Sequence, residues 1–145
     1  MEKRKKIMAI DLGTKRIGVA ISDETLLLAQ PYCVLKREGN KKDIQKIVKL
    51  ITTENICKIV IGIPLSNKES FMVESAKKFG NQLKESIEIS VEYLDETMTT
   101  VEAKEILKIA GYSEKKGRQI IDMLSAGKIL ESYLRKLEAK NNEKS

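Results

Sequence analysis

The N-terminal part of the chain alternates short apolar runs with turns, which is the pattern of consecutive β-strands. Two apolar runs, at residues 7–12 and 17–22, are separated by a turn that begins at Gly13. A third apolar stretch contains Pro31, which cannot donate a backbone hydrogen bond and therefore suits an edge strand. These patterns predict three antiparallel strands in succession.

The middle of the chain switches between helical and strand spacing. Apolar residues recur at helical spacing after Asn40 and again over residues 72–87, which predicts two amphipathic helices. Asn40 and Asp43 have the spacing of a helix start. The continuous apolar run 58–63 and the alternating run 89–94 predict two further strands. The second helix is expected to bury Met72, Ala76, Phe79, Gly80, Leu83 and Ile87.

The last part of the chain is predicted to be helical. Thr99 opens a capping-box pattern, and Gly111 is placed to end the helix that follows it. A long helix is expected from about Lys116 to Leu137, before a polar C-terminal tail at residues 138–145. The element order predicts one α/β domain over residues 1–137, with a five-stranded mixed sheet flanked by helices.

Charge and hydropathy narrow the class of partner. The chain of 145 residues has a net charge of +6, which favours a polyanionic partner without identifying it. Its apolar runs stay short of the ~18 residues that span a bilayer, and a charged N-terminus leads directly into a strand. We therefore expect a soluble, cytoplasmic protein with no membrane partner.

The absence of histidine restricts the chemistry. The sequence contains 0 histidines, which excludes Ser-His-Asp and Cys-His catalysis, a histidine general base and histidine-ligated zinc. Cys33 and Cys57 lie in apolar stretches and do not form a Cys-x-x-Cys pair, so they are expected to be buried free thiols. Any metal would therefore be a hard cation bound through oxygen.

Asp11 is a carboxylate inside the first predicted strand. An ionised carboxylate among apolar strand residues is destabilising unless it is hydrogen-bonded, paired or bound to a metal. Asp11 is therefore a candidate functional residue. The alternative is that Asp11 ends the strand and caps the Gly13 turn.

Asp122 is a second carboxylate in an apolar setting, within the last predicted helix. Ser125 and Ala126 share its helical face and are small enough to let the helix approach a sheet closely. The alternative is a solvated charge on a narrow polar stripe with Arg118 and Ser125.

Asp95 and Glu96 close the last predicted strand and complete the set of acidic candidates. If these carboxylates converge with Asp11 and Asp122, their mutual repulsion would be relieved by one or two Mg²⁺ or Mn²⁺ ions. Two such ions about 4 Å apart support in-line attack of water on a phosphodiester. The basic balance of the chain would then serve to hold a nucleic acid backbone.

Several segments along the chain match a known family in composition and order. They are residues 10–20 (Ile-Asp-Leu-Gly-Thr-Lys-Arg-Ile-Gly-Val-Ala), 22–23 (Ser-Asp), 62–65 (Gly-Ile-Pro-Leu), 95–96 (Asp-Glu) with Thr99 and Thr100, and Asp122 in a helix that closes with residues 126–130 (Ala-Gly-Lys-Ile-Leu). Together they closely resemble the YqgF family, also called RuvX. The resemblance implies a ribonuclease-H-like fold and a metal-dependent nuclease. The family was first described as Holliday junction resolvases and is now associated with maturation of the 5′ end of pre-16S ribosomal RNA.

The resemblance also implies roles for individual residues. By position, Asp11, Glu96 and Asp122 would be the catalytic acids that bind Mg²⁺ or Mn²⁺. The side chains expected at the nucleic acid are Thr14, Lys15, Arg16, Thr99, Thr100 and Arg118. The chain has Thr97 where the family usually has an arginine, and Arg118 is a candidate to supply the missing phosphate contact. Residues 66–70 also lack a glycine that the family tends to carry.

Four functional hypotheses follow. The first is a nuclease that processes pre-16S ribosomal RNA, on its own or on the ribosome. The second is a resolvase of branched DNA, whose paired incisions require a dimer, so a strict monomer would count against it. For the protein itself we expect a monomer or a weak homodimer. The third is an actin-like ATPase, suggested by residues 11–14 but needing a second domain. The fourth is a non-catalytic RNA-binding protein of ribosome assembly.

Overall fold

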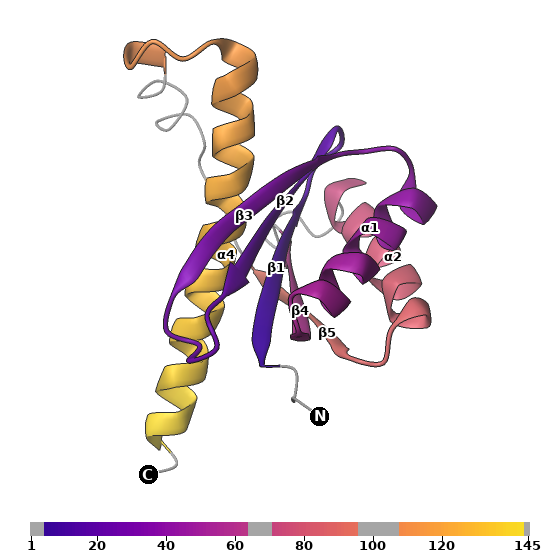
Figure 1. Cartoon of the computed structure of the whole chain (residues 1–145), viewed down its shortest axis with the longest axis vertical. Coiled ribbons are helices and arrows are strands. Elements are labelled where there is room, and N and C mark those ends of the chain that lie inside the picture. Colours follow the sequence, from indigo (N-terminus) through magenta and orange to yellow (C-terminus); the bar gives the residue numbers. More distant parts are fainter. Residues whose placement is uncertain (1–4, 64–70, 96–107, 144–145) are drawn as a thin grey trace.

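The chain forms a five-stranded sheet with helices on both faces. The computed structural model describes residues 5–63, 71–95 and 108–143 (Figure 1). The elements in chain order are β1 (Lys6–Leu12), β2 (Arg16–Ser22), β3 (Ala29–Lys36), α1 (Asn40–Thr53), β4 (Ile56–Ile63), α2 (Phe71–Ser86), β5 (Ser90–Asp95) and α4 (Glu114–Glu143). Figure 1 shows α1 and α2 on one side of the sheet and α4 on the other.

The strand order in the sheet is β3-β2-β1-β4-β5. β2 pairs antiparallel with β1 and β3, whereas β4 pairs parallel with β1 and β5. The predicted mixed sheet is confirmed, and Pro31 lies in β3 at one edge. Because β1, β4 and β5 run in the same direction, they end at one edge of the sheet, which we call the carboxyl edge.

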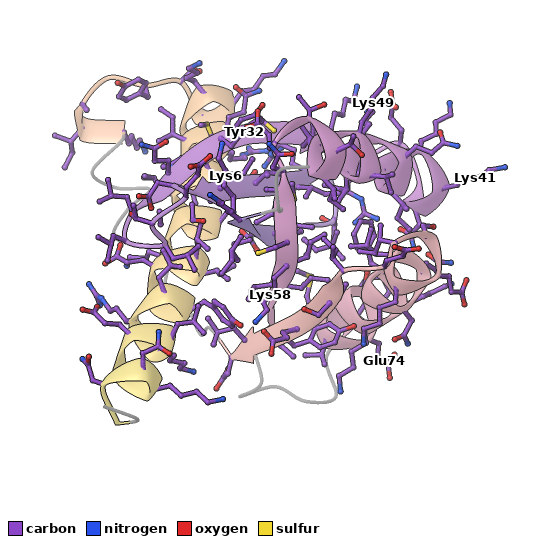
Figure 2. All side chains as sticks on the ribbon, turned by 60° about the horizontal axis from the view of Figure 1, so that its bottom comes forward. Lys6, Tyr32, Lys41, Lys49, Lys58 and Glu74 are labelled. Atoms are coloured by element: carbon purple, nitrogen blue, oxygen red, sulfur yellow. The ribbon has the colours of Figure 1, made fainter. Side chains whose placement is uncertain are left out.

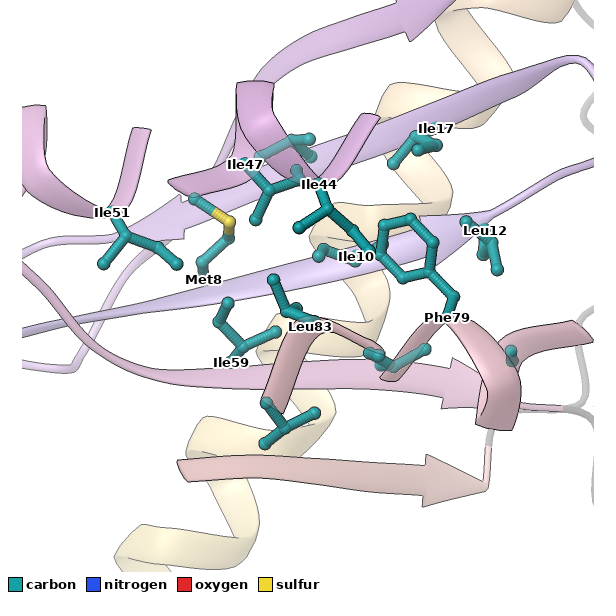
Figure 3. Close-up of a cluster of buried hydrophobic side chains, with 14 of the residues drawn as sticks. Met8, Ile10, Leu12, Ile17, Ile44, Ile47, Ile51, Ile59, Phe79 and Leu83 are labelled. Atoms are coloured by element: carbon teal, nitrogen blue, oxygen red, sulfur yellow. The ribbon is translucent and has the colours of Figure 1, made fainter. Parts of the chain in front are cut away.

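The face of the sheet under α1 and α2 carries the larger hydrophobic core. Met8 and Ile10 of β1 point to this face and are fully buried, together with Ile47 of α1 and Phe79 and Leu83 of α2 (Figure 3). Every second residue of β1 therefore belongs to this core, and the intervening residues face α4.

The opposite face is lined by small residues that let α4 lie close to the sheet. Ala9 and Ala20 pack there against Ala126 and Leu130 of α4. A Cβ atom added at Gly18 would lie 2.1 Å from the carbonyl oxygen of Asp122. Only glycine fits at this crossing of β2 and α4, so the contact fixes Asp122 against the sheet.

The helix ends differ from the sequence predictions in one cap and one boundary. α1 begins at Asn40 as predicted, after Gly39 with φ 109°, but no side chain caps it. The Asn40 side chain instead accepts a hydrogen bond from Arg37 and donates one to Gln82. α4 continues to Glu143, so residues 138–143 extend the helix rather than forming a separate tail.

Burial also corrects two predictions. Met72 is 38% exposed and Val73 takes its place on the buried face of α2, because the helix begins at Phe71 with a different face toward the sheet. Cys33 and Cys57 are free thiols but only half-buried, since each lies at the margin of a core. Gly111, with φ 90°, ends the helical stretch at residues 108–109, as expected.

Several expectations concern residues outside the described ranges. Pro64, the residues 66–70 and the capping-box residue Thr99 belong to this group. Among the residues that the structure describes, no helix has the length and apolar character needed to cross a membrane.

Candidate functional site

Asp11 lies near the carboxyl edge, on the face of the sheet that α4 covers. Ile7 and Ala9 of β1 pack against α4, and Asp11 follows in the same alternation. Its neighbour on β2 is Gly18, so no side chain separates it from α4 at that position. Asp11 is only partly buried, yet burial raises the pKa of its carboxyl to about 6, and the nearby charge of Asp122 contributes to this rise.

Asp122 reaches the same place from α4. The contact between its backbone and Gly18 brings the helix against β2, directly beside the strand that carries Asp11. Its side chain is 25% exposed, and its Oδ2 accepts a hydrogen bond of 2.5 Å from Nε of Arg16. Asp122 therefore faces the sheet and the other acidic candidate, rather than a solvated stripe of α4.

Arg16, expected beside the phosphates, begins β2 and pairs with Asp122. The Arg16 side chain is itself 25% exposed. An arginine has five N–H donors, so the pair with Asp122 leaves further donors for an anion at the surface. Arg16 can thus both hold Asp122 in place and contact a phosphate.

The β1–β2 turn places two further predicted contacts at the surface. Thr14 and Lys15 are exposed at the tip of this turn. The backbone N–H of Gly13 donates to the carbonyl oxygen of Arg16 at 2.9 Å, which closes the turn. Thr14 and Lys15 are therefore presented to solvent next to the strand ends that carry Asp11 and Arg16.

The register of β5 bears on whether Asp95 or Glu96 joins this site. Leu94 packs against α4, and Asp95 is paired with Ile63, which belongs to the core under α1 and α2. By strand alternation Asp95 points to the face opposite Asp11. Glu96, Thr97, Thr99 and Thr100 lie outside the described residues.

Arg118 lies one helical turn before Asp122 on α4. Its side chain is 44% exposed and pairs with Glu114 at 3.3 Å. Lys108 and Tyr112 line a cavity with Arg118 at this end of the helix. Arg118 is thus placed outward from the two carboxylates, where an extended ligand could reach it.

Further basic side chains stand on the outer face of α1. Lys41, Lys42 and Lys49 are exposed, and Figure 2 shows Lys41 and Lys49 extending away from the sheet. They lie on the other side of the sheet from α4. Positive charge is therefore spread around the molecule rather than confined to the neighbourhood of Asp11.

The donor set at Asp11 and Asp122 fits a hard divalent cation. Both groups offer carboxylate oxygen, and Mg²⁺ commonly uses only one or two protein carboxylates while keeping several waters. Burial and the charge of Asp122 raise the pKa of Asp11, and a bound divalent cation would favour its ionised form. No group of three or more acidic or cysteine side chains gathers within residues 5–63, 71–95 and 108–143, so a third acidic ligand would come from elsewhere.

Gly18 and Arg37 shape this site, and neither was singled out by the sequence analysis as a functional residue. Gly18 had one available signal, because a glycine inside a strand often marks close approach of another backbone. Arg37 had none, because the groups that it contacts include Gly13, which is distant in the sequence.

Comparison with known proteins agrees with the fold and with the sequence motifs. The family model described as "RuvX: Holliday junction resolvase" matches residues 5–136. A protein of Natranaerobius thermophilus named "Putative pre-16S rRNA nuclease" is 38% identical over 139 residues, covering 94% of this chain and 99% of the relative. A protein of Syntrophus aciditrophicus with the same name is 40% identical over 131 residues, covering 89% of this chain and 87% of the relative.

Solved structures confirm the ribonuclease-H-like fold. The fowlpox virus resolvase in complex with Holliday junction DNA superposes with a TM-score of 0.56 at 17% identity, covering 91% of this chain and 98% of the resolvase. T. thermophilus RuvC in complex with a Holliday junction gives a TM-score of 0.56 at 12% identity, covering 92% of this chain and 96% of RuvC. The motifs, the fold and the family match agree, and the chain belongs to the RuvX family of nucleases.

Proposed function

We propose that this protein is a divalent-metal-dependent nuclease that processes the 5′ end of pre-16S ribosomal RNA in the cytoplasm. The proposal is carried by the proximity of Asp11, in β1, to Asp122, in α4. The two carboxylates are close enough for the charge of Asp122 to raise the pKa of Asp11. The relatives named for pre-16S ribosomal RNA support this choice of substrate.

The metal would be Mg²⁺ or Mn²⁺, held by Asp11, Asp122 and Glu96. When bound, the metal supplies Lewis-acid activation of water and of the scissile phosphate. The register of β5 supports Glu96 over Asp95, because Asp95 faces the other side of the sheet from Asp11.

The remaining residues of the site bind and orient the substrate. Lys15 supplies positive charge to the phosphate backbone at the surface, and the Thr14 hydroxyl can donate to a phosphate oxygen. Arg16 keeps the Asp122 carboxylate in a fixed orientation and offers its free N–H donors to the same phosphate. Thr99, Thr100 and Arg118 are proposed as further contacts to the nucleic acid. Hydrolysis would leave a 5′ phosphate on the product.

Resolution of branched DNA is the second candidate. It is supported by the description of the family model and by the fold shared with two resolvases in complex with junction DNA. Symmetric cleavage of a junction needs two active sites, so this function requires a homodimer. An RNA-binding protein without turnover is the third candidate.

A direct comparison of substrates tests the proposal. The purified protein is incubated with a fragment of pre-16S ribosomal RNA that spans the mature 5′ end, and separately with a four-way DNA junction, each with Mg²⁺ or Mn²⁺. We expect cleavage of the RNA and none of the junction. Cleavage of the junction alone would assign the resolvase function. Binding of the RNA without cleavage, in the presence of assembled ribosomal subunits as well, would assign the RNA-binding function.

Asp95→Asn is the matched control for these assays. It removes a carboxylate at the same edge of the sheet but from the opposite face. We expect its cleavage rate to stay within about threefold of the parent protein. A loss as large as that of Asp11→Asn would instead show that Asp95 is part of the metal site.

A further inference from the structure

Arg37 follows β3 and makes an unusually complete set of contacts. Its side chain is only 15% exposed. Nε donates to Oδ2 of Asp43 at 2.8 Å, Nη1 to the carbonyl oxygen of Gly13 at 2.9 Å, and Nη2 to Oδ1 of Asn40 at 2.6 Å. The guanidinium also lies 5.7 Å from the centre of the Phe79 ring. One side chain thus joins β3 to α1, α2 and the β1–β2 turn.

The backbone of Arg37 holds the same turn at a second point. Its N–H donates to the carbonyl oxygen of Lys15 at 2.9 Å. The side chain and the main chain of Arg37 therefore bind the turn at Gly13 and at Lys15, on either side of Thr14. Thr14 and Lys15 keep their own side chains exposed to solvent.

Asp43 fixes the direction of the Arg37 side chain. It is 0% exposed, and besides Arg37 it accepts a hydrogen bond of 3.0 Å from the backbone N–H of Glu38. Asn40 is held in turn by its contact with Gln82 of α2 at 2.8 Å. Asp43 and Asn40 are therefore each held by a second hydrogen bond. Movement of the guanidinium away from Gly13 would break or weaken its charge-assisted hydrogen bonds to both side chains.

A buried ion pair of this kind is weak evidence for a stabilising role. The free energy lost by removing two charges from water nearly cancels the free energy gained from their attraction. A pair of apolar side chains in the same place often stabilises a fold equally well. What an apolar pair cannot do is bind the carbonyl oxygen of Gly13, two residues after Asp11. The network is thus suited to fixing the backbone next to the candidate site.

We propose that Arg37 is a positioning residue that fixes the β1–β2 turn, so that Thr14 and Lys15 meet the phosphate backbone of RNA without first being ordered. This inference rests on the proposed function, because it concerns the same site. A turn already in its bound conformation avoids the entropic cost of ordering on binding. Arg37 therefore acts on substrate affinity and on KM, and leaves metal binding at Asp11 and Asp122 unchanged.

Arg37→Lys tests the proposal with little disturbance of the core. Lysine keeps a positive charge beside Asp43, but its single ammonium group lacks the planar fork that reaches three acceptors at once. We expect about tenfold weaker binding of a fluorescent pre-16S RNA fragment, measured with Ca²⁺ in place of Mg²⁺ to prevent cleavage. We also expect faster hydrogen exchange at residues 13–16 and an unchanged rise of Tm on addition of Mg²⁺.

Lys58→Gln is the matched control. Lys58 contacts Tyr133 at 2.8 Å and Glu92 at 3.2 Å, at the end of β4 away from the carboxyl edge (Figure 2). Its loss should lower stability without changing RNA affinity. If Arg37→Lys fails to fold, the double variant Arg37→Gln with Asp43→Asn replaces it, because neutral amides avoid an unpaired buried charge.

The outcomes separate this inference from the proposed function. RNA affinity of Arg37→Lys equal to that of the parent protein, or an equal loss in Lys58→Gln, would overturn the positioning role. If the parent binds RNA but cleaves nothing, the proposed catalysis fails while the comparison of affinities still decides the role of Arg37. If the parent does not bind RNA at all, both are overturned.

Discussion

Replacement of Asp11 by asparagine is expected to stabilise the metal-free protein. Burial and the charge of Asp122 raise the pKa of Asp11 from 3.8 to about 6, so the ionised carboxylate is destabilising at neutral pH. A rise of this size corresponds to about 3 kcal/mol of unfolding free energy above pH 6. Asparagine has nearly the same shape and no charge. The asparagine amide would be hydrogen-bonded imperfectly, at a cost of about 1 kcal/mol, so we expect a net gain of about 2 kcal/mol in the free energy of unfolding at neutral pH.

The pH dependence identifies the source of the gain. Between about pH 4 and pH 6 the folded protein keeps a proton on Asp11 that the unfolded chain has lost, so the stability of the parent falls as the pH rises through this window. The advantage of Asp11→Asn is therefore largest above pH 6 and fades as the pH falls toward 4. At pH 4.5 the contribution of the charge should fall to about a third of its value at pH 7.5, roughly 1 kcal/mol, which the imperfect hydrogen bonds of the amide offset. The net gain in the free energy of unfolding at pH 4.5 should therefore be close to zero.

Urea unfolding at pH 7.5 and pH 4.5 in EDTA, followed by circular dichroism, measures this difference. Asp95→Asn serves as the control for the loss of one negative charge from a chain of net charge +6. An Asp11→Asn variant that is less stable than the parent, or a gain that is the same at both pH values, would refute the reasoning. Either result would mean that the Asp11 carboxylate stabilises the fold. It would then not be a functional group that destabilises the metal-free protein.

Three further predictions follow from the same structure. Excess Mg²⁺ should raise the Tm of the parent protein by a few degrees and leave the Tm of Asp11→Asn unchanged, because only the parent keeps all the metal ligands. An equal rise of Tm in both proteins would mean that the metal binds elsewhere. Gly18→Ala should destabilise the fold by about 3 kcal/mol in urea unfolding, because the added Cβ would lie 2.1 Å from the backbone oxygen of Asp122. An unchanged midpoint of the urea transition would mean that α4 can move away from β2. Gly127→Ala, in α4, should instead stabilise the fold by about 0.5–1 kcal/mol, because the added Cβ would lie 3.5 Å from its nearest neighbour, Pro31, and alanine favours the helix. A loss of stability would show tighter packing of α4 against β3.

Much of the fold could be predicted from local patterns. Strand alternation and Pro31 gave the mixed sheet with its edge strand, since both depend on residues adjacent in sequence. The start of α1 at Asn40 was predicted, but its capping was not, because the Asn40 side chain binds Arg37 and Gln82 instead of the first turn of the helix. Competition of this kind between local and long-range partners is not visible in a sequence.

The candidate site shows the same division. Asp11 and Asp122 could each be selected, because a carboxylate in an apolar segment is conspicuous on its own. Their proximity could not be derived from spacing, since it depends on how closely α4 crosses Gly18. The role of Arg37 had no local signal, because its contact with Gly13 forms only when the end of β3 meets the β1–β2 turn.

The rate of RNA cleavage under single-turnover conditions tests the central claim most directly. The parent protein, Asp11→Asn and Asp95→Asn are each mixed in excess with a pre-16S RNA fragment and saturating Mg²⁺. The account predicts a rate at least about a thousandfold lower for Asp11→Asn and a nearly unchanged rate for Asp95→Asn. Cleavage by Asp11→Asn at the rate of the parent would contradict it.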